Sequence, residues 1–442
     1  MSNKAKTSLV PKLRFPEFHG AGEWIKEKLG SLASISTEKV GNEICVPMSI
    51  TSGVGLVSQE DKFGRVIAGS SYKNYFLLKP NDFAYNKSAT KEYPEGFLAL
   101  YSGDKLAAVP NSIFTCFRIK GDSPNPQYLN YLFLGNLHGQ WLRNFIQVGA
   151  RAHGSLSIND SDLLALPVPL PKGQSSLAEQ QKIAICLSSL DELIAAQAGK
   201  VDALKTHKKV LMQQLFPREG ETQPRLRLPE FRNAGEWKVS SIQELIDRGF
   251  IVGHLDGNHG SLYPRSEEFS DSGVPYISAT SFKNGGIDFD RCKFLPEERA
   301  AQFKKGIACD GDILFAHNAT VGPVAKLTTK CDFVILSTSL TYFRCNRAFL
   351  SSDFLKCALV SPAFVDQCAR VMSQSTRNQI PITTQRTFSL QLPTLPEQLC
   401  IADCLTSLDA LITAVTQELE TLNTHKKGLM KQLFPVLEGG RR

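Results

Sequence analysis

Histidines and lysines in glycine-containing stretches are the first residues of this sequence that could bind a metal or a phosphate. His254 and His259 lie five residues apart in GHLDGNHG, residues 253–260. A zinc site needs three or four ligands, and no third one accompanies the pair, so we interpret this stretch as a surface loop. Gly199 and Lys200 lie in a helical pattern without the rest of a phosphate-binding loop, and no HExxH pattern is present. These residues predict no metal site and no catalytic site.

One further stretch could do chemistry. NPQY at 125–128 resembles in part the Asn-Pro-Pro-aromatic motif with which amino-methyltransferases hold their target amine. The second proline is missing, and no glycine-rich methyl-donor motif precedes it. We therefore interpret Asn125 as the N-cap of the helix predicted to follow it. The chain is predicted to be no enzyme and to bind no cofactor itself.

Length and composition indicate the class of protein to which this chain belongs. A chain of 442 residues predicts more than one domain. The formal net charge of +7 permits nucleic acid as a partner without establishing it. The eleven cysteines form no CxxC pair and have apolar neighbours, which favours reduced thiols in a cytoplasmic protein. No run of eighteen apolar residues occurs, so we expect no membrane partner.

Two internal repeats organise the chain. Residues 179–217 align without gaps on 397–435, with 23 of 39 positions identical and an offset of 218. Upstream of each copy, 11–24 matches 224–237 at 10 of 14 positions, with an offset of 213. The sequences between these repeats are unlike. Constant segments around two different inserts indicate one scaffold that carries two different binding domains.

The longer repeat has the period of a coiled coil. Apolar residues recur in alternating steps of four and three, and each copy ends at a Phe-Pro pair that a helix cannot pass. We expect two helices of about 58 Å that pack antiparallel about a pseudo-two-fold axis, with Lys208 and Lys426 at matching seam positions. The alternative is that each helix packs on its own domain. The predicted seam consists of Ile183, Leu187, Leu190, Ile194, Val201, Leu204, Leu211, Leu215, Ile401, Leu405, Leu408, Ile412, Leu419, Leu422, Leu429 and Leu433.

The two inserts share a pattern of short strands followed by a helical stretch. KPNDFAYNKS parallels CDGDILFAHNATVG, and ARAHGSLSI parallels STRNQIPIT. The expected fold class is α+β, with two globular domains of one fold separated by the two long antiparallel helices. The predicted boundaries are a first domain at 1–171, a helix at 177–217, a second domain at 218–393, a helix at 395–435 and a tail at 436–442.

These features together resemble one known family over nearly the whole chain. The resemblance is to the specificity subunit of type I restriction–modification systems. It is carried by the GAGEW start at 20–24 with its counterpart NAGEW at 233–237, the YNKS and HNATVG turns, the LPVPLP and LPTLPEQ helix entries and the LMQQLF helix end. The resemblance implies two target-recognition domains that read the halves of a bipartite, asymmetric site in double-stranded DNA. It implies two methyltransferase subunits and restriction (motor) subunits as partners, which would hold the methyl donor, ATP and magnesium.

Candidate DNA-binding residues follow from the chemistry of base recognition, in which Arg and Lys suit guanine and Asn and Gln suit adenine. They lie in one turn and one loop of each insert, and the turn asparagines have the alternative role of bonding their own backbone. The candidates are Tyr85, Asn86, Lys87, Ser88, Arg151, His153, His317, Asn318, Thr320, Arg377, Asn378 and Gln379. The competing interpretation is a two-headed coiled-coil scaffold whose end domains bind a ligand other than DNA.

Overall fold

The computed structural model describes residues 9–51, 53–146, 156–374 and 377–436. The chain divides into two compact units. Unit 1 contains residues 1–196 and 419–442, and unit 2 contains residues 197–418. Each unit therefore combines one globular domain with one half of each of the two long helices, α6 (Ser176–Leu215) and α12 (Leu395–Leu433).

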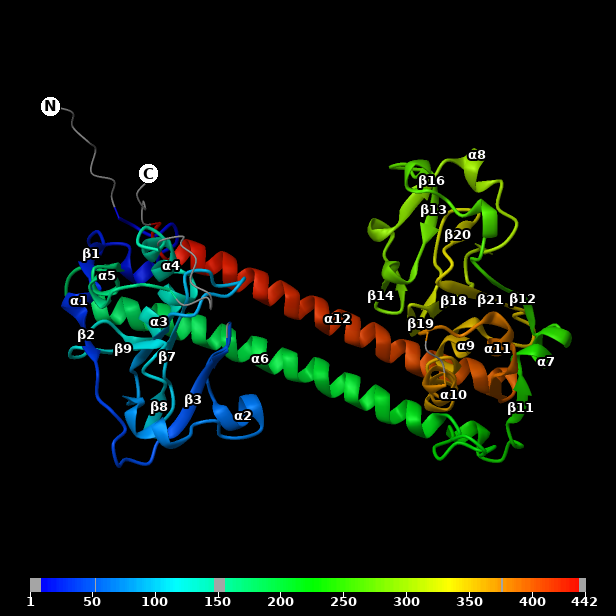
Figure 1. The fold of residues 1–442 in the computed structure, drawn as a ribbon, viewed down its shortest axis with the longest axis horizontal. Coiled ribbons are helices and arrows are strands. Elements are labelled where there is room, and N and C mark those ends of the chain that lie inside the picture. The colour runs from blue at the N-terminus through cyan, green and yellow to red at the C-terminus, as the bar shows by residue number, and fades with distance from the viewer. Residues whose placement is uncertain (1–8, 52, 147–155, 375–376, 437–442) are drawn as a thin grey trace. The chain divides into compact units, whose positions relative to one another are not determined.

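The globular domain of unit 1 contains two four-stranded sheets (Figure 1). The first has the order β2-β9-β6-β7, with bounds Ala33–Ser36, Phe114–Ile119, Phe83–Asn86 and Phe97–Leu100. The second has the order β4-β3-β8-β5, with bounds Gly55–Ser58, Val46–Thr51, Ala107–Val109 and Phe76–Leu78. Strands β1 (Ile25–Lys28) and β10 (Pro167–Leu170) pair separately. The short helices are α1 (Leu29–Leu32), α2 (Gln59–Phe63), α3 (Pro126–Leu134), α4 (Leu137–Leu142) and α5 (Asp160–Leu164).

The globular domain of unit 2 repeats this plan. Its first sheet has the order β12-β21-β18-β19, with bounds Ile251–Asp256, Leu340–Cys345, Ile313–Asn318 and Thr320–Lys326. Its second has the order β16-β13-β20-β17, with bounds Lys293–Leu295, Val274–Ile277, Val334–Leu336 and Ile307–Ala308. The pairs β11–β22 (Lys238–Ser241, Ser389–Leu392) and β14–β15 (Phe282–Lys283, Gly286–Ile287) complete the strands. The short helices are α7 (Ile242–Asp247), α8 (Glu297–Ala300), α9 (Ser352–Ala358), α10 (Pro362–Ser373) and α11 (Ile382–Thr387).

The two domains share one topology, as the sequence predicts. In each domain the first sheet is antiparallel throughout, and the second contains one parallel pair, β3 with β8 and β13 with β20. An ion pair recurs at the same place in the first sheet: Asp82 binds Arg118 through two 2.7 Å contacts, and Asp312 binds Arg344 at 3.0 and 2.7 Å. The expected α+β class with an internal repeat is confirmed.

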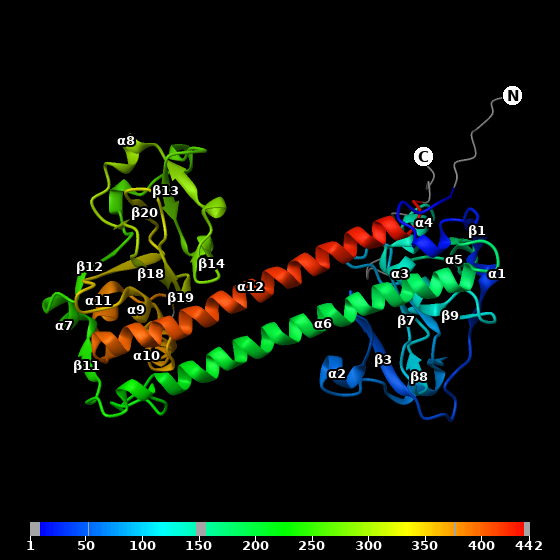
Figure 2. The same ribbon diagram turned by 180° about the vertical axis from the view of Figure 1, so that it is seen from behind.

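Within each unit, the halves of α6 and α12 lie side by side and run in opposite directions (Figures 1 and 2). In unit 1, Ile183 and Leu187, near the start of α6, share a core with Leu433, at the end of α12. In unit 2, Leu215, at the end of α6, shares a core with Ile401 and Leu405 near the start of α12. All sixteen predicted seam residues are buried or half-buried. The helices end two residues before Pro217 and Pro435, where the Phe-Pro pairs predict the end.

Helix α12 carries an apolar stretch with a mean hydropathy of 1.6, so it is long and apolar enough to cross a membrane by these two criteria. Part of its apolar surface is covered within each unit by α6 and by the globular domain. Its Asp409 also binds Lys208 of α6 at 2.5 Å, and a charged pair is costly in lipid. These contacts favour packing against protein, as the seam pattern predicts.

Candidate nucleic-acid and subunit interface

The predicted turn and loop of unit 2 come together in the structure. Strand β18 ends at Asn318, which forms an isolated antiparallel bridge with Gln379. The Ala319 amide donates to the Asn378 carbonyl at 2.9 Å, and the Ile380 amide donates to the His317 carbonyl at 2.8 Å. Ala319 adopts a left-handed conformation with φ of 63°, which is uncommon for a residue other than glycine. Such strain persists where surrounding contacts hold it, often at a binding site.

This junction presents polar side chains on the surface of unit 2. Thr320, Arg377 and Asn378 are exposed, and Asn318 and Gln379 are half-buried. The register of β18 with β19 shifts between Phe315 and His317, and such irregularities redirect the side chains that follow them. The five polar residues that we predicted on either side of this junction therefore form one accessible cluster.

Unit 1 has the same junction. The Leu156 amide donates to the Lys87 carbonyl at 2.7 Å, as Ile380 does to His317 in unit 2. Asn86, Lys87 and Ser88 are half-buried. The Ser88 amide donates to Asn86 Oδ1 at 2.9 Å, so Asn86 also has the turn role that was its alternative interpretation. The candidates Arg151 and His153 lie outside the described residues.

Two predicted DNA contacts are corrected by their burial. Tyr85 has 0% exposure, packs in the core of unit 1 and donates its hydroxyl to the Glu95 carbonyl at 2.7 Å. His317 has 2% exposure, and its Nδ1 donates to the Ile380 carbonyl at 3.1 Å. Both lie on a strand whose side chains alternate between faces, and both point inward. Neither side chain is accessible to DNA in this structure, so we remove Tyr85 and His317 from the candidates.

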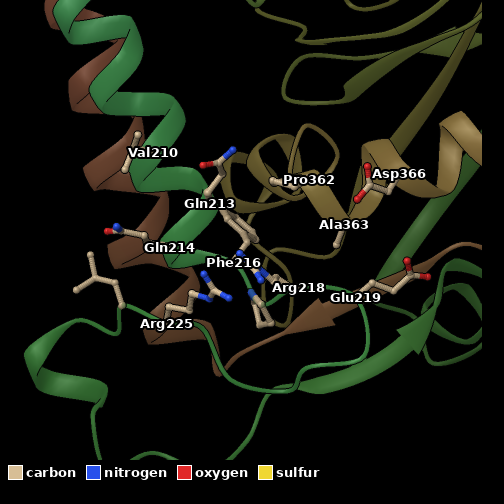
Figure 3. Close-up of a pocket in the computed structure, with 12 residues that line it drawn as sticks. Val210, Gln213, Gln214, Phe216, Arg218, Glu219, Arg225, Pro362, Ala363 and Asp366 are labelled. Atoms are coloured by element: carbon tan, nitrogen blue, oxygen red, sulfur yellow. The ribbon is translucent and has the colours of Figure 1, made fainter.

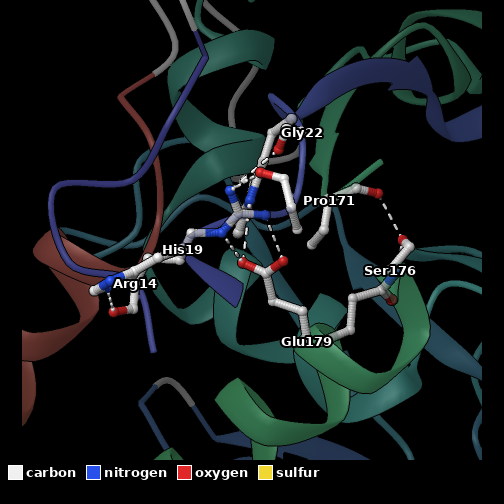
Figure 4. Close-up of polar contacts among 9 residues, drawn as sticks. Arg14, His19, Gly22, Pro171, Ser176 and Glu179 are labelled. Atoms are coloured by element: carbon white, nitrogen blue, oxygen red, sulfur yellow. Dashed lines mark hydrogen bonds and ion pairs between the residues drawn. The ribbon is translucent and has the colours of Figure 1, made fainter. Parts of the chain in front are cut away.

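A buried ion pair ties the short repeat of unit 1 to the start of α6 (Figure 4). Arg14 Nε and Nη2 each donate to the Glu179 carboxylate at 2.7 Å, and Arg14 Nη1 donates to the Ala21 carbonyl at 2.7 Å. The Trp24 indole N–H reaches the same carboxylate at 3.3 Å. The Glu179 side chain is 1% exposed. The two charge-assisted hydrogen bonds offset the cost of removing the carboxylate from water.

Unit 2 contains the equivalent buried ion pair, with the same geometry. Arg227 donates two bonds of 2.8 Å to Glu397, and the Trp237 indole reaches it at 3.2 Å. The next helical residue also has a repeated role: the Asn125 amide donates to Gln180 Oε1 at 2.8 Å, and the Ser351 amide donates to Gln398 Oε1 at 3.0 Å. Asn125 and Ser351 are the N-caps of α3 and α9. The repeats thus place both domains on the long helices by the same contacts, and Asn125 is confirmed as a cap.

Ion pairs join α6 to α12 at the seam lysines. Lys208 binds Asp409 at 2.5 Å in unit 2, and Lys426 binds Asp191 in unit 1. All four side chains are partly exposed. The equivalent residues of the two helices therefore form equivalent pairs, because the helices are antiparallel. This geometry supports the predicted role of the seam lysines in fixing the helix register.

A pocket lies where α6 ends in unit 2 (Figure 3). It has a volume of about 640 Å³, and its walls come from the end of α6, the short repeat and α10. Phe216, Arg218 and Arg225 line it, facing Pro362 and Asp366. Where α12 ends in unit 1, the equivalent residues Phe434, Val436 and Lys12 line a pocket of about 490 Å³. Both pockets combine an apolar wall with basic side chains beside a helix C-terminus.

Residues 235–424 match the family model described as type I restriction modification DNA specificity domain. The chain is similar to type I restriction–modification specificity subunits. Two Methanocaldococcus jannaschii proteins are similar to it, each 25% identical. The type I restriction enzyme MjaVIII specificity subunit matches over 66% of this chain and 66% of its own length. The putative type I restriction enzyme MjaX specificity subunit matches over 77% of this chain and 74% of its own.

Solved structures from type I restriction–modification systems share the fold of this chain. The type I restriction–modification S subunit from M. genitalium superposes with a TM-score of 0.55 at 17% identity, covering 97% of this chain and all of that one. A chain from a study of complex assembly and conformational transition of the type I system also gives 0.55, at 16% identity and 93% and 97% coverage. The family match and the similar proteins therefore support a specificity subunit with a DNA-recognition domain.

Sequence reasoning missed two buried histidines of unit 2. His254 and His259, which we expected on a surface loop, are buried: His254 stacks on Phe343, and His259 bonds the Leu336 carbonyl at 2.7 Å. The stretch IVGHLD does not alternate between polar and apolar residues, and the pairing of β12 with β21 shifts register between Ile251 and Gly253, so no local pattern predicts the burial of His254. Among the described residues, no group of three or more potential metal ligands is present. All eleven cysteines lie in the described part and are free thiols.

Burial makes the stability of each unit depend on pH. Burial lowers the pKa of His254 in unit 2 and of His138 in unit 1 to about 4, against about 6.5 in an unfolded chain. Because only the unfolded state takes up these protons between pH 6.5 and 4, stability is full above 6.5 and falls as the pH drops. We expect His254→Gln to reduce this slope by up to about 1.4 kcal/mol per pH unit.

Urea unfolding of the wild type and the variant from pH 7 to pH 4.5 measures that difference in slope. The exposed His207, also in unit 2, serves as the control through His207→Gln. Equal slopes for the wild type and His254→Gln would show that His254 is protonated in the folded state as well.

Proposed function

We propose that this specificity subunit reads a bipartite, asymmetric site in double-stranded DNA, one half with each globular domain. The observation that supports it most is the repeated junction between a strand end and a loop, at Lys87 with Leu156 and at His317 with Ile380. The same backbone contacts hold unlike side chains in the two units. Two domains of one fold with different contact residues would read two different half-sites.

The proposed base-reading residues of unit 2 are those exposed or half-exposed at the junction. Arginine pairs bidentately with guanine, and asparagine and glutamine pair with adenine, so Arg377, Asn378 and Gln379 provide the donors that such readout needs. Thr320 and Asn318 lie across the bridge from them. In unit 1, Asn86, Lys87 and Ser88 are the corresponding residues among those described.

We further propose that the long helices set the spacing between the half-sites and recruit two methyltransferase subunits. The two equivalent pockets at the helix ends support two copies of one partner, because each is built from equivalent residues of the repeats. Restriction subunits would join this assembly. In this proposal the chain is non-catalytic and works in the cytoplasm, and its partners hold the methyl donor, ATP and magnesium.

Replacing residues 238–390 by the corresponding insert of a relative with another specificity tests the proposal. We expect the assembled methyltransferase to modify adenines at a site in which one half has changed and the other half and the spacing are unchanged. Sequencing of modified adenines in cells with the wild-type chain, the hybrid chain or neither provides the measurement. A site that stays the same, or one that changes in both halves, would contradict one-domain–one-half reading.

A further inference from the structure

The recognition loop of unit 2, residues 377–380, ends at a firmly held backbone position. Its first three residues are proposed to read bases, and its last, Ile380, has 0% exposure. Ile380 precedes Pro381, and a residue before proline is restricted to extended backbone conformations. The Ile380 amide donates to the His317 carbonyl at 2.8 Å. The exposed part of the loop is therefore attached to an anchor inside the domain.

Two buried side chains donate to the carbonyl of that anchor. His317, on β18, donates from Nδ1 to the Ile380 carbonyl at 3.1 Å, and Gln385, on α11, donates from Nε2 at 3.0 Å. Their exposed fractions are 2% and 0%. Displacing the carbonyl would leave both buried N–H groups without a partner, which is costly. His317, which burial removes from the DNA contacts, thus holds the end of the recognition loop.

Gln385 uses all of its hydrogen-bonding groups, which fixes its orientation. Its second N–H donates to Thr341 Oγ1 on β21 at 3.1 Å, and its Oε1 accepts from His254 Nε2 on β12 at 3.3 Å. Burial lowers the pKa of His254 to about 4, so the neutral ring has one N–H to donate, and its Nδ1 faces Arg386 Nε at 3.5 Å. The network therefore connects three strands of the first sheet, β12, β18 and β21, to a single carbonyl of the loop.

Unit 1 supports the corresponding helix by a different contact. Thr115 occupies the position on β9 that Thr341 occupies on β21. The Thr115 hydroxyl donates to Asp160 Oδ1 at 3.0 Å, at the first residue of α5. Asp160 is exposed, whereas Gln385 is buried. An equivalent threonine thus contacts the helix that follows the junction in each unit, through a partner that differs between the inserts. A substitution of Gln385 should therefore affect unit 2 alone.

We propose that Gln385 and His317 are positioning residues for DNA reading by unit 2, because they hold the Ile380 carbonyl and thereby orient the base-reading side chains of the recognition loop. This deepens the proposed function and rests on it. Hydrogen bonds to base edges discriminate between bases only within a narrow range of distance and angle. A loop without this support keeps its base-reading side chains but accepts wrong base pairs more readily.

Gln385→Met tests this role, because methionine is similar in length and removes the three hydrogen bonds. The full chain, assembled with purified methyltransferase subunits, modifies genomic DNA from cells without this system. Sequencing during the initial, linear phase measures the ratio of modified adenines at sites with one wrong base pair to those at the cognate site. A variant with a smaller folded fraction modifies all sites less by the same factor, so this ratio does not change.

We expect Gln385→Met to raise the ratio at least about tenfold for wrong base pairs in the half-site read by unit 2. The ratio for the other half-site should stay at the wild-type value. The hybrid chain with exchanged residues 238–390 identifies which half-site belongs to unit 2.

Gln367→Met is the matched control in the same unit. Gln367 also makes three hydrogen bonds, one to Ala363 and two to Ser389. These bonds lie on α10 and between α10 and the start of β22 rather than at the recognition loop. We expect the wild-type ratio for both half-sites.

His317→Leu is the second variant, and it decides the question if circular dichroism shows that Gln385→Met does not fold. Nε2 of His317 has no hydrogen-bond partner among the described residues, so leucine removes one unpaired buried atom together with the donor. We expect a rise of at least about threefold in the ratio for the unit 2 half-site, because one donor to the carbonyl is lost.

The outcomes separate this proposal from the proposed function. A wild-type ratio in the deciding variant, or a rise that is equal in both half-sites or equally large in Gln367→Met, overturns the positioning role and leaves the proposed function intact. A wild-type chain that directs no site-specific modification overturns both.

Discussion

Replacing Glu397 by alanine is expected to lower the free energy of unfolding of unit 2 by about 3–5 kcal/mol. The carboxylate accepts two bonds from Arg227 and one from Trp237, and its side chain is 1% exposed. Its removal leaves a guanidinium without its partner and a buried indole N–H unpaired. The short repeat would then lose its attachment to the start of α12. Urea unfolding followed by circular dichroism measures the change.

Glu219→Ala is the matched control for this prediction. Glu219 binds Arg370 with two short contacts of 2.5 and 2.6 Å, but both side chains are more than half exposed. Exposed pairs contribute little, because water solvates each charge after the pair is broken. We expect no measurable change. If both variants lose similar stability, burial is not what gives the Arg227–Glu397 pair its importance.

Leu187→Asp is expected to destabilise unit 1 by more than about 4 kcal/mol, which is enough to prevent its folding. Leu187 has 0% exposure and packs in the core that joins α6, the globular domain and the end of α12. The substitution removes a packed side chain and puts a carboxylate into an apolar site without a partner. Loss of cooperative unfolding and of protease resistance in residues 9–196 would report it.

Leu193→Asp separates a seam effect from a general effect of charge on the helix. Leu193 lies six residues further along α6 and is 51% exposed. Because its carboxylate would remain in water, we expect stability close to that of the wild type. Two variants that fold equally well would place the packed face of α6 elsewhere.

The helices and the internal repeat could be predicted from sequence because their signals are local and periodic. The four-three spacing of apolar residues gives the packed face of α6 and α12, and the Phe-Pro pairs give their ends. The unlike inserts were assigned one fold from the similar order of strands and turns. That order suffices because sheet topology follows from where strands begin and end, not from the identity of each residue.

The candidate site was harder to predict because it depends on contacts between distant residues. The bridge between Asn318 and Gln379 joins a strand end to a loop 61 residues later in the chain, and we grouped them because the two inserts follow parallel patterns. Tyr85 and His317 were predicted to contact bases from their residue type alone. Whether such a side chain is buried depends on the face of the strand that carries it, and both lie on a buried face. The buried ion pairs of Glu179 and Glu397 were not predicted, although Arg, Trp and Glu recur at matching positions of the repeats.

The paired lysines and aspartates carry a consequence for the origin of such a chain. Helix α6 contains both Asp191 and Lys208, and α12 contains both Asp409 and Lys426. Because each lysine finds the aspartate of the other helix, two copies of a single helix could form the same two bonds. Two copies of one half could thus form the same ion pairs between their helices, which is the arrangement expected if duplication and fusion of a homodimeric half gave rise to this chain.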